Sequence, residues 1–132
     1  MRRMILATAL VLLSVGAMAQ TEPSYKDKVL EGYIRTGTRE TCIPINSIKS
    51  TKILDYSNIL FYTNGGPVYL NELPKQCGPL NRCRSITYST SLSKLCNTDT
   101  VDIMDFGSSV PKLGTCGLRQ FELLTEKKHV GQ

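Results

Sequence analysis

Three apolar runs separated by turn-forming residues lie within residues 51–73 and predict three β-strands joined by two tight turns. The second run, residues 59–63, ends at Asn64-Gly65-Gly66, and Asn and Gly tolerate the positive φ that a tight hairpin turn requires. Pro67 opens the third run, where its missing N–H matters least, at the start of a strand or on a sheet edge. Both faces of the second run are apolar, which indicates a sheet that is curled or covered on both sides.

Residues 24–35 predict a short amphipathic helix, because their apolar positions recur at helical spacing. Ser24 followed by Asp27 resembles a capping box, and Gly37 is typical of the end of a helix. Gly32 weakens the pattern, so a frayed tail is the alternative for this segment.

The chain beyond the central strands runs through a Gly/Pro-rich loop, residues 75–83, and then returns to short apolar runs. We predict further strands at residues 86–90, 95–96, 100–104 and 115–123. Alternation in residues 100–104 directs Val101 and Ile103 toward the core. The predicted fold is therefore mainly β, a small antiparallel sheet curled toward a barrel with one short N-terminal helix, and an α+β arrangement is the alternative.

The first 19 residues have the features of a secretory signal peptide. Basic Arg2-Arg3 precede an apolar run, and Ala17-Met18-Ala19 fits a small-x-small cleavage site. The apolar run is shorter than the ~20 residues of a membrane span. We therefore expect cleavage after Ala19 and a periplasmic or secreted protein without a membrane span in the mature chain. The predicted division is a signal peptide (1–19), a segment with the helix (20–40), a β domain (41–124) and a disordered tail (125–132).

The chain has a net charge of +5, but the way this charge is distributed argues against a nucleic-acid partner. Removing Arg2 and Arg3 with the signal peptide leaves 14 basic and 11 acidic residues, a net charge of about +3. The surplus is scattered along the chain, and Lys127-Lys128 is the basic doublet that remains. Nucleic-acid binding would need a clustered basic stripe with stacking aromatic residues.

The five cysteines of an exported chain predict two disulfides and one leftover thiol. Pairing four of the five allows 15 arrangements, and spacing alone leaves them open. Loop-closure entropy gives about 4.5 kcal/mol for a Cys42–Cys116 link, about 3.3 for Cys77–Cys96 and about 2.4 for Cys77–Cys83. These values rank the links only weakly, because geometry overrides them.

No catalytic, cofactor-binding or metal-ligating residues are predicted. His129 is the only histidine and lies in the tail, so a Cys/His nucleophile pair would depend on that residue. Cys77 and Cys83 are separated by five residues rather than by the two of a redox C-x-x-C motif. With one remote histidine, zinc would need four cysteines, and export favours disulfides instead.

The acidic and aromatic residues have ordinary interpretations as well. Asp99, Asp102 and Asp105 recur at every third position, whereas a calcium loop carries its acidic residues at every second one. We interpret them as solvated charges on a strand and its turns. Four tyrosines lie on or beside predicted strands and either pack there or line a ligand groove. They are Tyr56, Tyr62, Tyr69 and Tyr88.

A series of motifs, taken in order and spacing together, covers residues 41–122. The series is Thr41-Cys42-Ile43, Ile48-x-x-Thr51-x-Ile53-x-Asp55, Ile59-Leu60-Phe61, Gly65-Gly66-x-x-Tyr69-x-Asn71-x-Leu73-Pro74, Cys77-x-x-Leu80, Tyr88, Leu95-Cys96-x-x-Asp99 and Cys116-x-Leu118-x-x-Phe121. In these residues the chain resembles a family of short exported bacterial proteins, domain of unknown function 6491.

The resemblance has consequences for the cysteines but not for activity. The family pattern has cysteines at the positions matching 42, 77, 96 and 116, so Cys83 is the departure of this chain and the expected free thiol. The resemblance favours the disulfides Cys42–Cys116 and Cys77–Cys96. It implies no activity and carries over no catalytic residues.

Two functions follow as hypotheses. The first is a non-enzymatic exported envelope protein, a binding or structural module that uses a sheet face or an exposed strand edge. Its expected partner is a protein or small-molecule ligand of the cell envelope, and the expected state is a monomer, with a dimer linked through Cys83 as the alternative. The second hypothesis is a small periplasmic hydrolase or thiol-dependent enzyme, for which an exposed, reactive Cys83 would be evidence.

Overall fold

The computed structural model describes Val11, residues 22–90 and residues 92–127. The predicted signal peptide (1–19) and its cleavage after Ala19 lie outside the described residues apart from Val11, and so do His129 and the end of the predicted tail. In the described ranges, no helix combines the length and the apolar character needed to cross a membrane.

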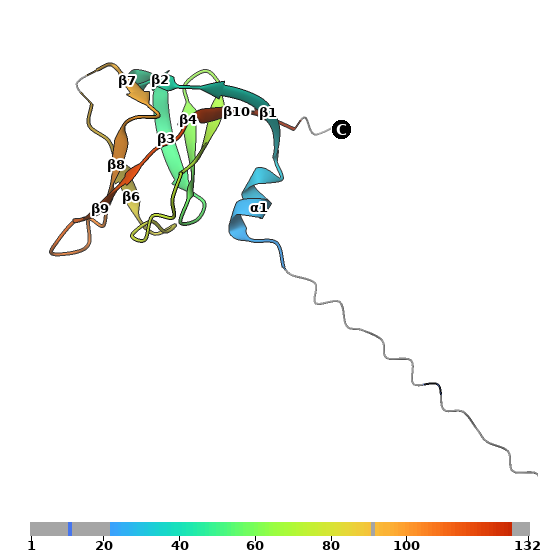
Figure 1. Cartoon of the computed structure of the whole chain (residues 1–132), viewed down its shortest axis with the longest axis horizontal. Helices are drawn as coiled ribbons and strands as arrows, with labels where there is room; N and C mark the ends of the chain where they lie inside the picture. Colours follow the sequence, from blue (N-terminus) through green and yellow to red (C-terminus); the bar gives the residue numbers. More distant parts are fainter. Residues whose placement is uncertain (1–10, 12–21, 91, 128–132) are drawn as a thin grey trace, which may run out of the picture.

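Strands dominate the described part of the chain and form three antiparallel sheets. In chain order the elements are α1 (Tyr25–Leu30), β1 (Tyr33–Glu40), β2 (Cys42–Pro44), the 3-10 turn η1 (Ile45–Ser47), β3 (Ile48–Ile53), β4 (Asn58–Thr63), β5 (Val68–Glu72), β6 (Ser85–Thr87), β7 (Lys94–Cys96), β8 (Thr100–Met104), β9 (Lys112–Gly117) and β10 (Phe121–Glu126). The sheets have the strand orders β1-β10-β5-β4-β3, β6-β8-β9 and β2-β7. Figure 1 shows α1 on one side of the five-stranded sheet and β6, β8 and β9 on the other. The predicted mainly-β, antiparallel class with one short helix is confirmed, although the three sheets stay separate and close no barrel.

The predicted hairpin joins β4 to β5. The Thr63 N–H donates to the Pro67 C=O at 3.1 Å, and Gly65 and Gly66 adopt φ values of +88° and +119°. These angles favour glycine because it has no Cβ. Pro67 precedes β5, as expected of a residue that cannot donate to a ladder. The strand before this hairpin, β3, begins at Ile48, three residues before the predicted start of the strand region at residue 51.

Both faces of the five-stranded sheet are buried, as the apolar pattern of residues 59–63 predicts. Ile59 and Phe61 of β4 face the three-stranded sheet, whereas Leu60 and Tyr62 face α1. The core between the sheets consists of Ile43, Ile53, Ile59, Phe61, Leu73, Cys77, Leu80, Leu95, Val101, Ile103, Leu118 and Phe121. The smaller core beneath α1 consists of Leu54, Leu60, Val68, Leu70 and Leu124. Val101 and Ile103 are fully buried, which confirms the alternation predicted for β8.

The helix α1 is shorter than the predicted range of residues 24–35. Its capping box is present, because the Asp27 N–H donates to Ser24 Oγ and the Ser24 N–H donates to Asp27 Oδ2, each at 3.2 Å. The helix nevertheless ends at Leu30, and β1 starts at Tyr33. So short a helix gains its stability from packing on the sheet, and the residues beyond it find backbone partners in the ladder with β10.

The strand β1 corrects the predicted domain boundaries. It pairs with β10 from Tyr33 opposite Glu126 to Glu40 opposite Phe121. The register shifts within residues 35–39, where Gly37 has a φ of +75°, so this glycine shapes a β-bulge rather than the end of a helix. Residues 33–40 therefore belong to the β domain, and β10 extends past the predicted start of the tail at residue 125.

The predicted last strand, residues 115–123, is two strands in different sheets. β9 ends at Gly117, β10 begins at Phe121, and the chain crosses between the sheets in the intervening residues. Asn71, fully buried on β5, holds this crossing in place. Its Nδ2 donates to the Arg119 C=O at 2.6 Å, and its Oδ1 accepts the Arg119 N–H at 2.9 Å. The amide thus supplies the partners that a sheet ladder would otherwise provide.

The disulfides join Cys42 to Cys96 and Cys77 to Cys116, while Cys83 is free and exposed. The predicted links Cys42–Cys116 and Cys77–Cys96 are wrong, although the same four cysteines are used. The strand register explains the first link, because Cys42 lies directly opposite Cys96 in the β2–β7 ladder. The second link ties the loop after β5 to β9, and so joins the two larger sheets.

Candidate functional site

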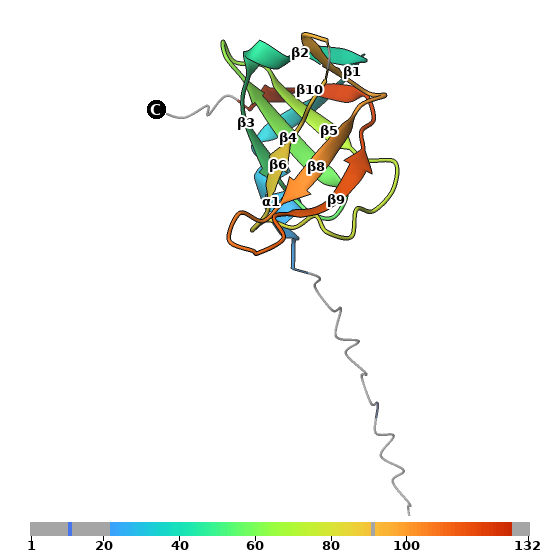
Figure 2. The same ribbon diagram turned by 90° about the vertical axis from the view of Figure 1, so that its left-hand side faces the viewer.

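A pocket of about 380 Å³ lies where two of the sheets end without joining. β3 is an edge strand of the five-stranded sheet, and β6 is an edge strand of the three-stranded sheet (Figure 2). We call this cavity the seam pocket. It is lined by Tyr25, Thr51, Lys52, Ile53, Arg82, Arg84, Ser85 and Ile86.

The strand β3 presents backbone groups to the seam pocket. The Leu54 N–H donates to the Asn58 C=O at 2.9 Å, which fixes the residue pairs that exchange hydrogen bonds with β4. Because such pairs alternate along an antiparallel ladder, the N–H and C=O groups of Thr51 and Ile53 point away from β4. Within the described ranges β3 forms a ladder with β4 alone, so both residues keep an outward donor and acceptor.

The strand β6 presents Ile86 in the same way. The Leu118 N–H donates to the Asp99 C=O at 3.1 Å, which sets the alternation in the β8–β9 ladder. Carried across β8, this alternation makes Ile86 and Ile103 a pair that exchanges no hydrogen bonds. The N–H and C=O of Ile86 therefore point away from β8, and the seam pocket lies between two open strand edges.

Three cations surround the seam pocket. Lys52 and Arg82 are exposed, and Arg84 is half-buried. The Lys52 Nζ lies 5.9 Å from the ring centroid of Tyr25, and the Arg82 guanidinium carbon lies 4.3 Å from it, so both cations face the same aromatic ring. Among the described residues, the ion pairs all lie elsewhere, and none of these three cations has a carboxylate partner.

This arrangement favours an anionic ligand. Guanidinium groups bind carboxylates and phosphates through two parallel hydrogen bonds, and uncompensated positive charge in a cleft attracts anions. The hydroxyls of Thr51 and Ser85 add donors that carry no charge. The described residues that line the seam pocket include no carboxylate and no imidazole. The residues of the seam pocket are therefore equipped to bind an anion.

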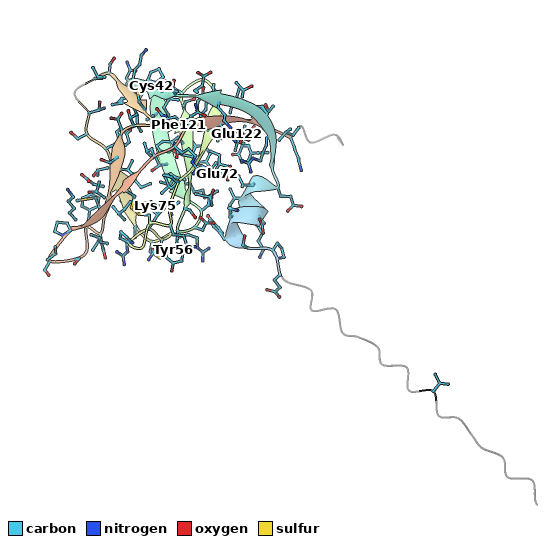
Figure 3. The ribbon with its side chains drawn as sticks, in the orientation of Figure 1. Cys42, Tyr56, Glu72, Lys75, Phe121 and Glu122 are labelled. Carbon is cyan, nitrogen blue, oxygen red and sulfur yellow. A yellow bond between two sulfur atoms is a disulfide. The ribbon has the colours of Figure 1, made fainter. Side chains whose placement is uncertain are left out.

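A second pocket, of about 370 Å³, shares Arg82 with the first and has Cys83 in its lining. Tyr56, which also lines it, lies at the end of the molecule away from β2 and β7 (Figure 3). Its one carboxylate, Asp55, accepts hydrogen bonds from the Ser57 N–H at 2.9 Å and the Asn58 Nδ2 at 2.8 Å. That carboxylate holds the β3–β4 turn, and the second pocket also contains the free, exposed thiol of Cys83.

An ionic cluster on the α1 side of the five-stranded sheet is structural. Glu122 on β10 is buried and accepts hydrogen bonds from Arg35 Nε at 2.9 Å and Arg35 Nη2 at 2.8 Å. The same guanidinium also contacts Glu72. Figure 3 labels the two glutamates, Glu72 and Glu122. Arg39 lies 3.9 Å from Glu122. These cations hold the pKa of Glu122 below its usual value, chiefly through the Arg35 hydrogen bonds. The cluster binds the edge strand β1 to the sheet.

Asp99, Asp102 and Asp105, which recur at every third position in the sequence, accept hydrogen bonds that hold turns and strands together. Asp99 Oδ2 accepts the Cys96 N–H at 2.7 Å, and Asp105 Oδ1 accepts the Gly107 N–H at 3.1 Å. Asp102 accepts the Thr115 hydroxyl at 2.8 Å, and this hydrogen bond lowers the pKa of Asp102. Over the residues that the structure places, no group of three or more potential ligands is arranged to hold a metal ion.

The four tyrosines for which the sequence suggests either packing or a ligand groove fall into two groups. Tyr62 packs beneath α1, and Tyr69 and Tyr88 pack against the core between the sheets. Burial raises the pKa of Tyr62 to about 12, with a smaller contribution from the neighbouring Tyr33. Tyr56 is exposed in the second pocket. Most of these tyrosines are thus packing residues.

Sequence analysis missed the seam pocket because its cations come from distant parts of the chain. Lys52 lies on β3, while Arg82 and Arg84 lie thirty residues and more further on, in the segment that leads into β6. Along the sequence this charge looks scattered, and only the approach of β3 to β6 gathers it. The close spacing of Arg82, Cys83 and Arg84 was the one local signal.

Comparisons with known proteins leave the family open. No protein-family model, no curated protein and no solved structure matches the chain. The resemblance to the exported bacterial family therefore stays a prediction from the sequence.

Proposed function

We propose that the protein is a non-enzymatic binding module of the cell envelope that captures an anionic ligand in the seam pocket. The observation that carries the proposal is the convergence of Lys52, Arg82 and Arg84 on one cavity without a carboxylate partner among the described residues. Two disulfides make the surrounding scaffold rigid, which reduces the entropy lost on binding. The expected signal peptide directs the module to the cell envelope.

The proposal is tested by an NMR titration of the purified, oxidised protein with pyrophosphate, which serves as a simple anionic probe. We expect saturable shifts of the backbone amides that line the seam pocket, at Thr51, Ile53 and Ile86. Replacing Lys52 by glutamine should weaken the binding about fivefold, as expected for the loss of one exposed charge pair. The matched control is Lys94→Gln, which removes the same charge from an exposed position on β7. Equal weakening by both variants, or shifts spread over the surface, would contradict the proposal.

The exposure of Cys83 favours a second candidate function, thiol chemistry in the second pocket. Cys83 shares the lining of this pocket with Arg82 and Tyr56. The rate of alkylation by iodoacetamide discriminates the two candidates. A rate more than about tenfold above that of free cysteine would support a thiol-dependent enzyme. A rate equal to that of free cysteine would leave Cys83 as a surface thiol.

A further inference from the structure

We infer that the ligand of the seam pocket is an extended acidic peptide, which adds to the edge of β3 as an antiparallel strand. This inference rests on the proposed function, because it takes the seam pocket as the binding site and names the class of its ligand. It adds one requirement that a simple anion does not have, namely hydrogen bonding through the backbone of the ligand.

The open edge of β3 supplies the backbone part of the argument. Thr51 and Ile53 each direct an N–H and a C=O into the seam pocket, at the alternate spacing with which an antiparallel strand exchanges hydrogen bonds. A fully ionised phosphate has no donor for the outward C=O groups, and a sugar does not repeat donors and acceptors at the spacing of a strand. The backbone of a peptide strand can pair with each outward N–H and C=O of Thr51 and Ile53. Recognition by strand addition at a sheet edge is a general mode of peptide binding. An antiparallel orientation agrees with the ladders that the described residues form.

The side chains on the two faces of β3 define the peptide further. Lys52 lies opposite Leu60, on the α1 side of the sheet, where Tyr25 and Arg82 meet it. Thr51 and Ile53 lie opposite residues of the core between the sheets, on the other face.

An added strand alternates its own side chains in the same way. It therefore directs every second side chain toward Lys52 and Arg82, and the others toward the apolar Ile53 and Ile86. Acidic residues suit the first set, and apolar residues suit the second.

The test uses the purified, oxidised protein and a capped hexapeptide of alternating glutamate and valine. Because peptide residues directly opposite Thr51 and Ile53 share their apolar face, the valines are the residues that exchange hydrogen bonds with β3. We expect saturable binding in a calorimetric titration, together with slower hydrogen exchange of the Thr51 and Ile53 amides in the complex. N-methylation of the valine amides should weaken binding about tenfold or more, because it removes the donors that face β3. The same peptide with lysine in place of glutamate should not bind.

Matched variants separate the charge from the backbone contribution. Lys52→Gln should weaken the acidic peptide about fivefold, whereas Lys94→Gln should leave its affinity unchanged. Neither change touches the backbone of β3, so the slow exchange of the Thr51 and Ile53 amides should persist in both saturated complexes.

Four outcomes would overturn the inference. Full retention of affinity by the N-methylated peptide would mean that the strand edge is not used. Pyrophosphate binding without peptide binding would remove the peptide while the anion-binding proposal stands, and the failure of both probes would remove both. Tighter binding of oligothymidylate in the seam pocket would replace the peptide by a nucleic acid.

Discussion

Replacing Glu122 by glutamine removes a buried charge from the five-stranded sheet and preserves the shape of the side chain. Glu122 is 5% exposed and accepts two hydrogen bonds from Arg35, with Arg39 further away. A hydrogen bond to a charged group contributes about 1.5–3 kcal/mol, and breaking a fully buried ion pair costs about 3–5 kcal/mol. The side chain of Arg35 is about half exposed and keeps its contact with Glu72, so it is not stranded without partners. We therefore expect Glu122→Gln to lower the free energy of unfolding by about 2 kcal/mol.

Urea unfolding at pH 7, with both disulfides intact, measures this loss. A slope of about 1–2 kcal/mol per molar urea for a domain of this size converts 2 kcal/mol into a midpoint lower by about 1–2 M. Glu126→Gln is the matched control, because Glu126 lies on the same strand, is exposed, and has no ion pair within the described residues. Its effect should stay within about 0.5 kcal/mol.

The pH dependence gives the same reasoning a second test. The pKa of Glu122 is lower in the folded protein than the ~4.3 of an unfolded chain. Its stabilisation is therefore complete above that value and is lost as the pH falls through the folded pKa. The difference in stability between the parent protein and Glu122→Gln should shrink progressively below about pH 4. Equal urea midpoints for the Glu122 and Glu126 variants, or a difference that stays constant from neutral pH into strong acid, would refute the reasoning.

Three further predictions concern other parts of the fold. Mass mapping of the oxidised protein should find the disulfides Cys42–Cys96 and Cys77–Cys116. These links span 54 and 39 residues, so removing either one should lower the free energy of unfolding by about 4 kcal/mol. Asn71→Ala should destabilise by about 2–3 kcal/mol in a urea titration, because it leaves the Arg119 backbone without partners, and an unchanged midpoint would contradict that role. Tyr62 should ionise near pH 12 in an ultraviolet titration, so folding stability falls as the pH rises from about 10, and Tyr62→Phe should remove this late step.

The parts of the fold that sequence analysis predicted depend on contacts between neighbouring residues. The hairpin at Gly65 and Gly66 needs only residues able to adopt positive φ, and the capping box of α1 needs only Ser24 and Asp27. The burial of Val101 follows from the alternation of one strand. Each of these features can be recognised within a few residues of sequence.

The parts that sequence analysis missed depend on partners that are distant along the chain. Tyr33 belongs to a strand and not to the predicted helix, because it pairs with Glu126 of β10. The predicted last strand divides because the buried amide of Asn71 holds a crossing between sheets. Cys42 pairs with Cys96 because the two residues lie opposite each other in the β2–β7 ladder. The spacing of cysteines along the sequence does not reveal this register. Local propensity is overridden in each case by a long-range contact.

The two edge strands of the five-stranded sheet, β1 and β3, differ in how their positive charges are balanced. This difference bears on whether the charges bind a ligand or only prevent another chain from pairing with the edge. Edge strands commonly carry cations that prevent another chain from pairing with them, and β1 and β3 both do so. On β1 the cations are Arg35 and Arg39, and the carboxylates of Glu72 and Glu122 offset their two charges. On β3 the cation Lys52 shares a cavity with two arginines, and no carboxylate of the described residues offsets them. Protection alone would explain a charge on either edge but not this difference between them, so an acidic strand should pair with β3 and leave β1 untouched.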